Sequence, residues 1–530
     1  MGLIRATGTI GALTLVSRVL GMVRDILVAR FLGAGLASDA FLIAWRLPNL
    51  FRALFAEGAF SAVFVPMFNR TMAQADKENP GSGQSAATVF AGQVLSVLFP
   101  FLVLFTIAMM LLAAPVVWAM TGGFPDGGPE KFALAVDLTR ITFPYLALIS
   151  LVSLLGGILN SLDRFWVNAA APVLLNICMI VAILFFRGDT PLETSYTQAI
   201  AVTVSGVLQL LWLMWSCARA GVVLRLGLPR LSPRVKQMLI LILPAAVGQG
   251  AIQFNLLIST SLAARFLPQG AVSYLYYADR LNQLPLGLIG IGVGTAILPA
   301  LSRQIGSGNE SAAKDTQNRA IELALFLGLP AAVALCIAST PLIRGLLQHG
   351  EFTATDTVGA ASALAVFALG VPAYVLIKVL TPGFYARQDT KTPVRVALFS
   401  MLFNLVGNLI LIWPLGHVGV AAATAIAAWV NVIILYWLLH RDNHLKADPR
   451  LRSRGARIIA ASAVMGAALW FIAPLADAHM AGGVWNRAIA LSLLCGGGAL
   501  VYAGAIFGTG AYRLSELRAL ITRRPASKAS

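Results

Sequence analysis

The sequence contains little charge for its length. Only 12% of its 530 residues are Asp, Glu, Lys or Arg, whereas 58% are hydrophobic. Soluble globular domains carry about 25% charged residues, and a soluble chain of this length would usually divide into several domains joined by polar linkers. Polar joints are short here. The composition therefore argues against a soluble protein and predicts a membrane protein.

Several signatures of chemistry are also missing. The four cysteines lie far apart in apolar segments, and the five histidines lie at or near joints, so neither a disulfide framework nor a buried histidine relay is expected. No G-x-x-x-x-G-K-[ST] loop for ATP is present. No H-E-x-x-H or G-x-S-x-G motif stands in a setting that would support catalysis. We therefore expect a protein that is not an enzyme and has no organic cofactor.

Long apolar runs recur from one end of the chain to the other. A run of about 20 apolar residues can cross a bilayer as a helix, whereas strands of a membrane barrel would alternate in polarity. The runs predict an all-α polytopic membrane protein with about 14 transmembrane helices. The predicted spans are 7–33, 40–68, 88–120, 132–159, 165–187, 196–218, 237–266, 271–302, 318–347, 355–381, 394–414, 418–440, 456–475 and 485–508.

The positive charge is unevenly distributed. A net charge of +17 could indicate nucleic-acid binding, but Arg and Lys crowd into alternate joints, such as 219–236, 441–457 and 513–528. The other joints are nearly free of them, which is the positive-inside pattern of helical membrane proteins. It predicts both termini in the cytoplasm, an even number of spans and no nucleic-acid partner.

The chain also repeats itself. ARFL begins at Ala29 and again at Ala264, and the segments 143–163 and 371–389 resemble each other. About six spans in each half keep both halves in the same orientation, so they form two lobes related by a parallel pseudo-two-fold repeat. Transporters with such repeats bind their substrates in the seam between the lobes.

The predicted organisation has six parts. The repeats give an N-lobe and a C-lobe, separated by a basic linker, and the last two helices lie outside the repeat, where they could form an apolar groove for a lipid tail. The parts are the N-lobe at 1–220, the linker at 221–236, the C-lobe at 237–441, a basic loop at 442–457, the two extra helices at 458–510 and a basic tail at 511–530.

Full charges lie inside several predicted spans, where a charge costs about 3 kcal/mol on insertion scales. Arginine presents a planar fork of donors that suits phosphate, so the arginines are candidates for binding an anionic head group, and the acids for gate latches. The alternative is that these charges only pair with each other and hold the lobes together. The candidate residues are Arg18, Arg24, Arg52 and Arg280, with the acids Asp25, Asp39, Glu57 and Asp279.

Three segments carry a family resemblance that covers essentially the whole chain. "SRVLGMVRDILVARFLGAGLASDAFLIAWRLPNLFRALFAEGAFSAVFVP" (17–66), "YYADRLNQLPLGLIGIGVGTAILPALSR" (276–303) and "FYARQDTKTPV" (384–394) resemble the signatures of the bacterial MurJ (MviN) family. The resemblance implies the fold of the multidrug/oligosaccharidyl-lipid/polysaccharide (MOP) exporter superfamily, to which the MATE transporters also belong. It implies a flippase that moves lipid II, the undecaprenyl-diphosphate-linked peptidoglycan precursor, from the cytoplasmic to the periplasmic leaflet of the inner membrane.

The same resemblance implies roles for individual residues. Arg24, Arg52 and Arg280 would hold the diphosphate with Arg18 in the same cavity, and Asp39 would lie near the periplasmic gate. At Gln283 many relatives carry an acid, so the role of that acid is in doubt in this chain. Some relatives bind sodium in the second lobe, and here Asp389 is a candidate ligand without a complete site. Coupling to a monovalent cation (Na+ or H+) or to the membrane potential stays open.

Two other functions stay open on the sequence. One is export of another polyprenyl-linked glycan or of a drug, although drug exporters of this fold usually have twelve spans and fewer cavity arginines. The other is a membrane scaffold or intramembrane enzyme of cell-wall assembly. The expected partners are lipid II and membrane phospholipids, with cell-wall synthesis proteins as further candidates, and we expect a monomer.

Overall fold

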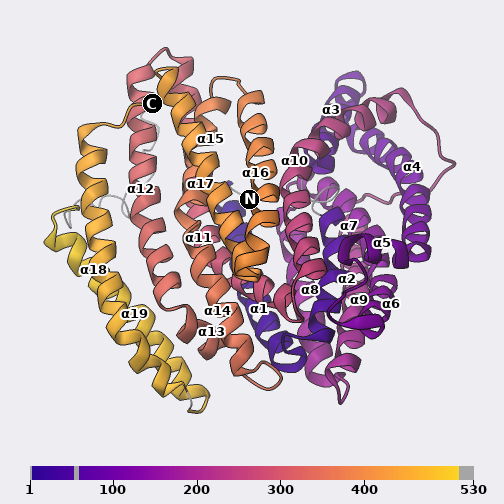
Figure 1. Cartoon of the computed structure of the whole chain (residues 1–530). Coiled ribbons are helices and arrows are strands. Elements are labelled where there is room, and N and C mark those ends of the chain that lie inside the picture. Colours follow the sequence, from indigo (N-terminus) through magenta and orange to yellow (C-terminus); the bar gives the residue numbers. More distant parts are fainter. Residues whose placement is uncertain (1–2, 53–58, 481, 513–530) are drawn as a thin grey trace. The chain divides into compact units, whose positions relative to one another are not determined.

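The computed structural model describes residues 3–52, 59–480 and 482–512 (Figure 1). Within these ranges the chain forms the helices α1 to α19 and no strand, which confirms the all-α prediction. It divides into two compact units, one of residues 1–273 with 349–353 and the other of residues 274–348 with 354–530. Each unit is described by itself.

The first unit contains the helices up to α10. Helix α1 packs on α8, α2 on α6, α3 on α4 and α7, and α10 on α2, α3 and α5. The bounds are α1 Leu3–Leu32, α2 Leu36–Phe51, α3 Ala59–Glu78, α4 Gly83–Leu111, α5 Ala113–Thr121, α6 Gly128–Thr142, α7 Pro144–Ser161, α8 Phe165–Phe185, α9 Pro191–Ala218 and α10 Pro233–Phe266.

The second unit contains nearly all of α11 and the helices after it. Helix α12 packs on α15 and α18, α16 packs on α17, and α18 packs on α19. The bounds are α11 Ala271–Gly306, α12 Glu310–Ile337, α13 Ser339–Leu347, α14 Ala354–Ala368, α15 Val371–Tyr385, α16 Lys391–Leu415, α17 His417–Arg441, α18 Pro449–His479 and α19 Val484–Gly508.

Ten helices or continuous helix pairs in the described part are long and apolar enough to cross a membrane. Many large apolar side chains are exposed, and Leu111, Phe185 and Leu500 are each 75% exposed. Such surfaces are unfavourable in water and suit contact with lipid. The chain is thus a multi-span membrane protein, while the count of 14 spans is not confirmed.

Four of the predicted spans are each divided by a helix boundary, although 132–159 and 355–381 still lie in continuous helix pairs that could each cross a membrane as one span. The spans at 88–120, 132–159, 318–347 and 355–381 correspond to α4–α5, α6–α7, α12–α13 and α14–α15. In each pair a proline lies in the first turn of the second helix, where its missing N–H costs no helical hydrogen bond but where it cannot continue the preceding helix. These prolines are Pro115, Pro144, Pro341 and Pro372.

The breaks reproduce the sequence repeat. In each unit a long helix is followed by one of nine residues, α5 or α13, and then by a second broken pair. Helix α10, which the repeat assigned to the C-lobe, belongs by its contacts to the first compact unit. The lobe boundaries drawn from the repeat stay a prediction.

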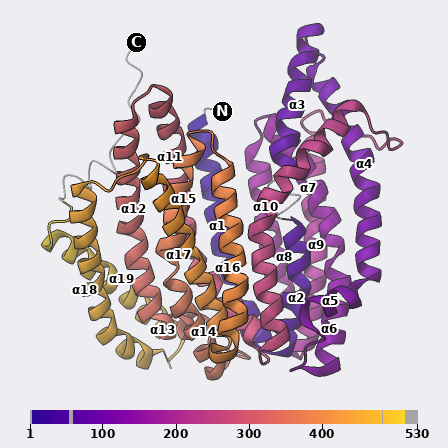
Figure 2. The ribbon, with the colours of Figure 1, turned by 45° about the horizontal axis from the view of Figure 1, so that its top comes forward.

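Helix α18 packs along α12, and α19 packs along α18 (Figure 2). Met465 and Leu469 of α18 form one buried cluster with Leu494 of α19. Ile458 and Ile506 form another, packed against Phe326 of α12. The α18–α19 hairpin is therefore joined to the rest of the second unit by apolar contacts along most of its length.

Candidate functional site

Arg24 lies on α1 in the interface with α8, where it is only 6% exposed. Its Nε and Nη2 donate to Asp25 Oδ1 at 3.0 and 2.7 Å, and its Nη1 donates to Asn176 Oδ1 at 3.0 Å. Asn176 in turn donates to the carbonyl of Ser17 at 2.9 Å. The guanidinium is thus held by two helices, and its charge is compensated by the adjacent carboxylate.

Asn176 is a site residue that the sequence reasoning missed. The periodicity of the helix shows that Arg24 needs a polar neighbour, but it does not show which helix supplies it. The available signal was a single asparagine in the apolar run 173–186, at a position matched by Asn404 in the second repeat. Arg18, on the same helix as Arg24, is exposed.

The end of α2 carries two further arginines. Arg52 is half-buried, and its Nε donates to Asn49 Oδ1 at 2.9 Å. The Nη2 of Arg46 donates to Thr260 Oγ1 at 2.8 Å and to the carbonyl of Leu256 at 3.2 Å, which ties α2 to α10. Glu57, a predicted cavity acid, lies outside the described residues.

Asp39 is the centre of a buried polar cluster. Its Oδ2 accepts hydrogen bonds from Lys131 Nζ at 2.9 Å and from the backbone N–H of Gly270 at 2.8 Å. Its Oδ1 accepts from the N–H and the hydroxyl of Ser273, at 3.0 and 2.6 Å. Lys131 also reaches Asp126 Oδ2 at 3.1 Å. Both Asp39 and Lys131 are 1% exposed.

The Asp39 cluster caps a helix from outside. Gly270 and Ser273 lie at the start of α11, where backbone N–H groups have no partner within the helix and the helix dipole favours a negative charge. Sequence reasoning identified Asp39 but neither Lys131 nor Ser273, because both lie far from it in the chain. The hydrogen bonds from Gly270 and Ser273 to Asp39 therefore hold the start of α11 against α2.

Asp279, Arg280 and Gln283 are grouped on α11 in the second unit. Gln283 Nε2 donates to Asp279 Oδ2 one turn away, and the Arg280 guanidinium lies 5.0 Å from the ring centre of Tyr276. A glutamine can donate this hydrogen bond, whereas an ionised glutamate cannot. The side chain at Gln283 is therefore matched to the neighbouring carboxylate.

Asp389 lies in the loop before α16. Its Oδ1 accepts from the backbone N–H groups of Lys391 and Thr392 at 3.1 and 3.0 Å. Hydrogen bonds from the side chain and backbone of Thr392 hold the pKa of Asp389 below its ordinary value. Among the described residues, no group of three or more His, Cys, Asp or Glu side chains could hold a metal ion. The structure gives Asp389 a capping role, and its part in cation binding stays a prediction.

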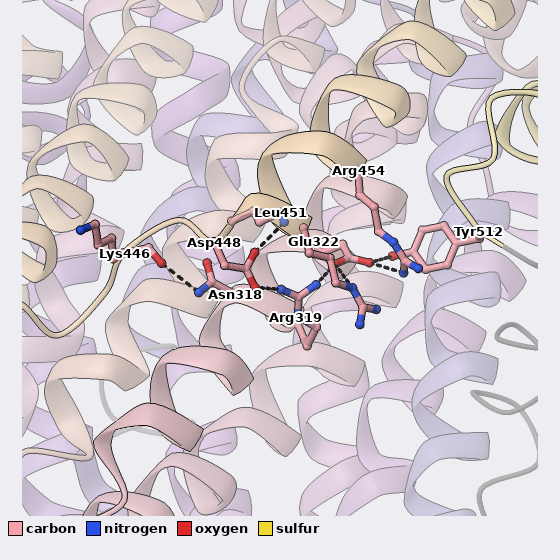
Figure 3. A network of polar contacts seen from close by, with 9 residues as sticks. Asn318, Arg319, Glu322, Lys446, Asp448, Leu451, Arg454 and Tyr512 are labelled. Carbon is pink, nitrogen blue, oxygen red and sulfur yellow. Dashed lines mark hydrogen bonds and ion pairs between the residues drawn. The ribbon is translucent and has the colours of Figure 1, made fainter.

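A second polar network joins α12, α18 and the segment after α19 (Figure 3). Glu322 is 2% exposed. It accepts from Arg454 at 2.9 Å and from the Tyr512 hydroxyl at 2.7 Å, and it pairs with Arg319 and with Arg450. Burial and the bond to Glu322 raise the pKa of Tyr512.

The same network extends to the start of α18. Asp448 pairs with Arg319, and it caps α18 by accepting from the backbone N–H of Leu451 at 2.6 Å. At the other end of the hairpin Arg344 pairs with Asp477 at 2.7 Å. Ionic contacts therefore fix the hairpin at both ends, and the sequence did not predict these pairs.

Comparison with known proteins identifies the family. The family model described as "Lipid II flippase MurJ" matches residues 28–484. The chain is 43% identical over 475 residues to the "Probable lipid II flippase MurJ" of Rhizobium tropici, covering 89% of this chain and 87% of that protein. It is 41% identical over 532 residues to that of Rhizobium meliloti (strain 1021), covering 99% and 97%.

Solved structures show the same fold. "Lipid II flippase MurJ, inward closed conformation" has a TM-score of 0.75 at 24% identity, covering 97% of this chain and 99% of that one. An inward-facing multidrug resistance MATE family transporter of the MOP superfamily has a TM-score of 0.64 at 17% identity, covering 81% and 94%. The chain therefore belongs to the MurJ family of lipid II flippases.

Proposed function

We propose that this chain moves lipid II from the cytoplasmic to the periplasmic leaflet of the bacterial inner membrane by alternating access, and so supplies cell-wall synthesis. The observation that carries this proposal is the family match, which extends over 99% of the chain for one relative. The reaction is transport, and no covalent step is required of any residue.

The head group would bind at the arginines of the membrane-embedded helices. Arg24, Arg52 and Arg280, with Arg18, supply guanidinium groups that suit a diphosphate. Arg24 is already oriented by Asn176, and Asp25 compensates its charge. A diphosphate that displaced Asp25 would keep an anion beside the Arg24 guanidinium, while the buried Asp25 carboxylate would need another partner in place of the arginine.

The acids have a complementary role in this proposal. Asp39, held by Lys131 and the start of α11, is the latch that must release when the periplasmic side opens. Asp279 lies beside Arg280, and Glu57 is a candidate cavity acid from the sequence. Breaking the Asp39 latch would leave a buried carboxylate and ammonium in need of new partners, so the closed arrangement is favoured until the substrate binds.

Orientation and energetics complete the proposal. The basic joints favour both termini in the cytoplasm. The membrane potential supplies about 2.3 kcal/mol per charge per 100 mV, so it or a monovalent cation gradient could drive the cycle. We propose a monomer whose partners are lipid II and membrane phospholipids, with cell-wall synthesis proteins as further candidates.

The test is the appearance of lipid II at the outer surface of cells in which the protein is rapidly inactivated. Outer-leaflet lipid II should fall within minutes, and expression of the wild-type chain should restore it, whereas Arg24→Ala should not do so at equal protein level. The matched control is Arg140→Ala, because the pair of Arg140 with Asp137 is half-exposed. Unchanged outer-leaflet lipid II, with increased sensitivity to cationic drugs, would favour a drug exporter instead.

A further inference from the structure

The segment between α9 and α10, residues 221–232, is held on the surface of α4. The Gln84 side chain donates to the carbonyl of Ala220 at 2.9 Å, just before the segment. The backbone N–H of Gly227 donates to Ser96 Oγ at 2.8 Å, and Ser232 Oγ donates to Gln93 Oε1 at 2.9 Å. The connecting segment is therefore fixed in place although it contains no helix.

The backbone of this segment approaches α4 closely. A Cβ placed on Gly92 of α4 would lie 3.3 Å from the carbonyl oxygen of Arg225, so a larger side chain there would press against the segment. Val222 is buried and Leu224 is half-buried, whereas four other large apolar side chains are exposed. Their exposed fractions are 64% for Val223, 60% for Leu226, 78% for Leu228 and 66% for Leu231.

The segment and its flanks are also uniformly basic. Residues 219–236 contain no Asp or Glu, so the basic side chains have no acidic neighbour in the sequence. The basic residues are Arg219, Arg225, Arg230, Arg234 and Lys236. Exposed leucines are unfavourable in water. Leucines alternating with basic residues suit a membrane surface, where anionic head groups lie above apolar acyl chains.

Aromatic residues mark the level of the membrane surface next to this segment. At the end of α9, Trp212 and Trp215 have ring centres 5.6 Å apart, and the Arg219 guanidinium lies 4.1 Å from the ring centre of Trp215. Trp166 of α8 packs edge-on to Trp212. Tryptophans gather at the boundary between head groups and acyl chains, so α9 ends at that boundary.

The change in polarity along α4 independently indicates the same position of the membrane surface. Its beginning, "GQSAATVFAGQ" (83–93), is mostly small and polar, and the following "VLSVLFPFLVLF" (94–105) is apolar. Gly227 is bonded to Ser96, just inside that change. Phe101 and Leu104 beyond it are exposed, as expected for contact with acyl chains. The connecting segment thus lies where α4 enters the membrane.

We propose that the connecting segment is a membrane-surface anchor that binds anionic phospholipid in the leaflet on the basic side of the protein. Its exposed leucines enter the boundary between head groups and acyl chains, while Arg225 and Arg230 bind lipid phosphates. The anchor keeps residues 221–232, which connect the two sequence repeats, at a fixed depth in the membrane surface. This inference needs only a membrane-spanning chain and does not depend on lipid II as the substrate.

The test uses a fluorescent amino acid incorporated at Leu228 of the full chain, in vesicles of phosphatidylcholine with or without phosphatidylglycerol. Lipids brominated on the acyl chain should quench the probe strongly, and aqueous iodide should quench it weakly. The same probe at Leu104, which is exposed on α4, gives the lipid-contact reference, and at Ser307, in an exposed loop, the aqueous reference.

The proposal is overturned if iodide quenches the Leu228 probe as well as the Ser307 probe. It is also overturned if neither quencher reaches Leu228, because the leucine would then face protein. The arginines are tested by R225Q/R230Q. Phosphatidylglycerol should increase lipid quenching at Leu228 in the parent chain by at least about twofold and leave it unchanged in the double variant. No effect of phosphatidylglycerol in the parent would remove the anionic-lipid part of the inference.

Discussion

The ammonium group of Lys131 lies 2.9 Å from Oδ2 of Asp39, and both side chains are almost completely buried. The same carboxylate receives three hydrogen bonds from Gly270 and Ser273 at the start of α11. Three separate parts of the first unit, α2, α6 and the beginning of α11, therefore converge on one carboxylate. Removing either charge would leave the other buried without its main partner.

Lys131→Met should destabilise the protein strongly. Breaking a buried ion pair from one side costs about 3–5 kcal/mol, although Asp39 keeps its backbone hydrogen bonds and the net loss should fall at the lower end. The measurement is the thermal unfolding temperature in detergent. The double variant D39N/K131M should regain part of the loss, because it also removes the fully buried carboxylate charge that K131M alone leaves without its ion pair, while Asp126, which loses Lys131 in both variants, is less buried. If the double variant is as unstable as the sum of the two single variants, the pair is not coupled.

Asn176→Ala should weaken substrate binding while the chain stays folded. Asn176 orients the Arg24 guanidinium, and a hydrogen bond to a charged group contributes about 1.5–3 kcal/mol. The expected loss in affinity for lipid II is about 10- to 100-fold, measured by titration of the purified protein. Asn79→Ala, at an exposed position, is the matched control. Equal affinity of both variants would contradict a positioning role.

The sequence predicted the helices well because long apolar runs and prolines act locally. Pro115 and Pro341 even marked the helix boundaries before α5 and α13. Mean hydropathy averages over such boundaries, so α4–α5 and α12–α13 were each predicted as one span. The repeat was visible because both halves contain the same short sequences, such as ARFL beginning at Ala29 and at Ala264. The structure shows the same pairs of broken helices in each unit.

The partners of the charges were not predictable in the same way. A spacing of seven residues puts Arg18 and Asp25 on one face of α1, yet Asp25 bonds to its neighbour Arg24, because the long arginine side chain can bend around its own helix. Lys131 and Asn176 were missed because their contacts depend on which helices pack together. The sequence left open whether the arginines bind an anionic head group or only pair with acids; in this structure Arg24 is buried and paired with Asp25.

Glu322→Gln should loosen the start of α18. The change leaves Arg319, Arg450 and Arg454 close together without the buried carboxylate that now compensates them. Hydrogen exchange of residues 449–458 should accelerate, and the unfolding temperature should fall. Tyr512→Phe is the control, because it removes a single hydrogen bond from Glu322 and keeps the charge. Equal exchange in both variants would mean that the charge of Glu322 does not hold the hairpin.

Asp389→Ala should lower the unfolding temperature by a few degrees near neutral pH, because a capping residue contributes about 0.5–2 kcal/mol. The folded-state pKa of Asp389 lies below its ordinary value, so its charge stabilises the folded state above the unfolded-state pKa of about 3.9. That contribution is lost as the pH falls through the folded-state pKa. The difference in unfolding temperature between wild type and D389N should therefore shrink below about pH 4.

A capping role also predicts that D389N transports lipid II with unchanged sodium dependence. A loss of sodium dependence in D389N at normal stability would instead establish Asp389 as a cation ligand.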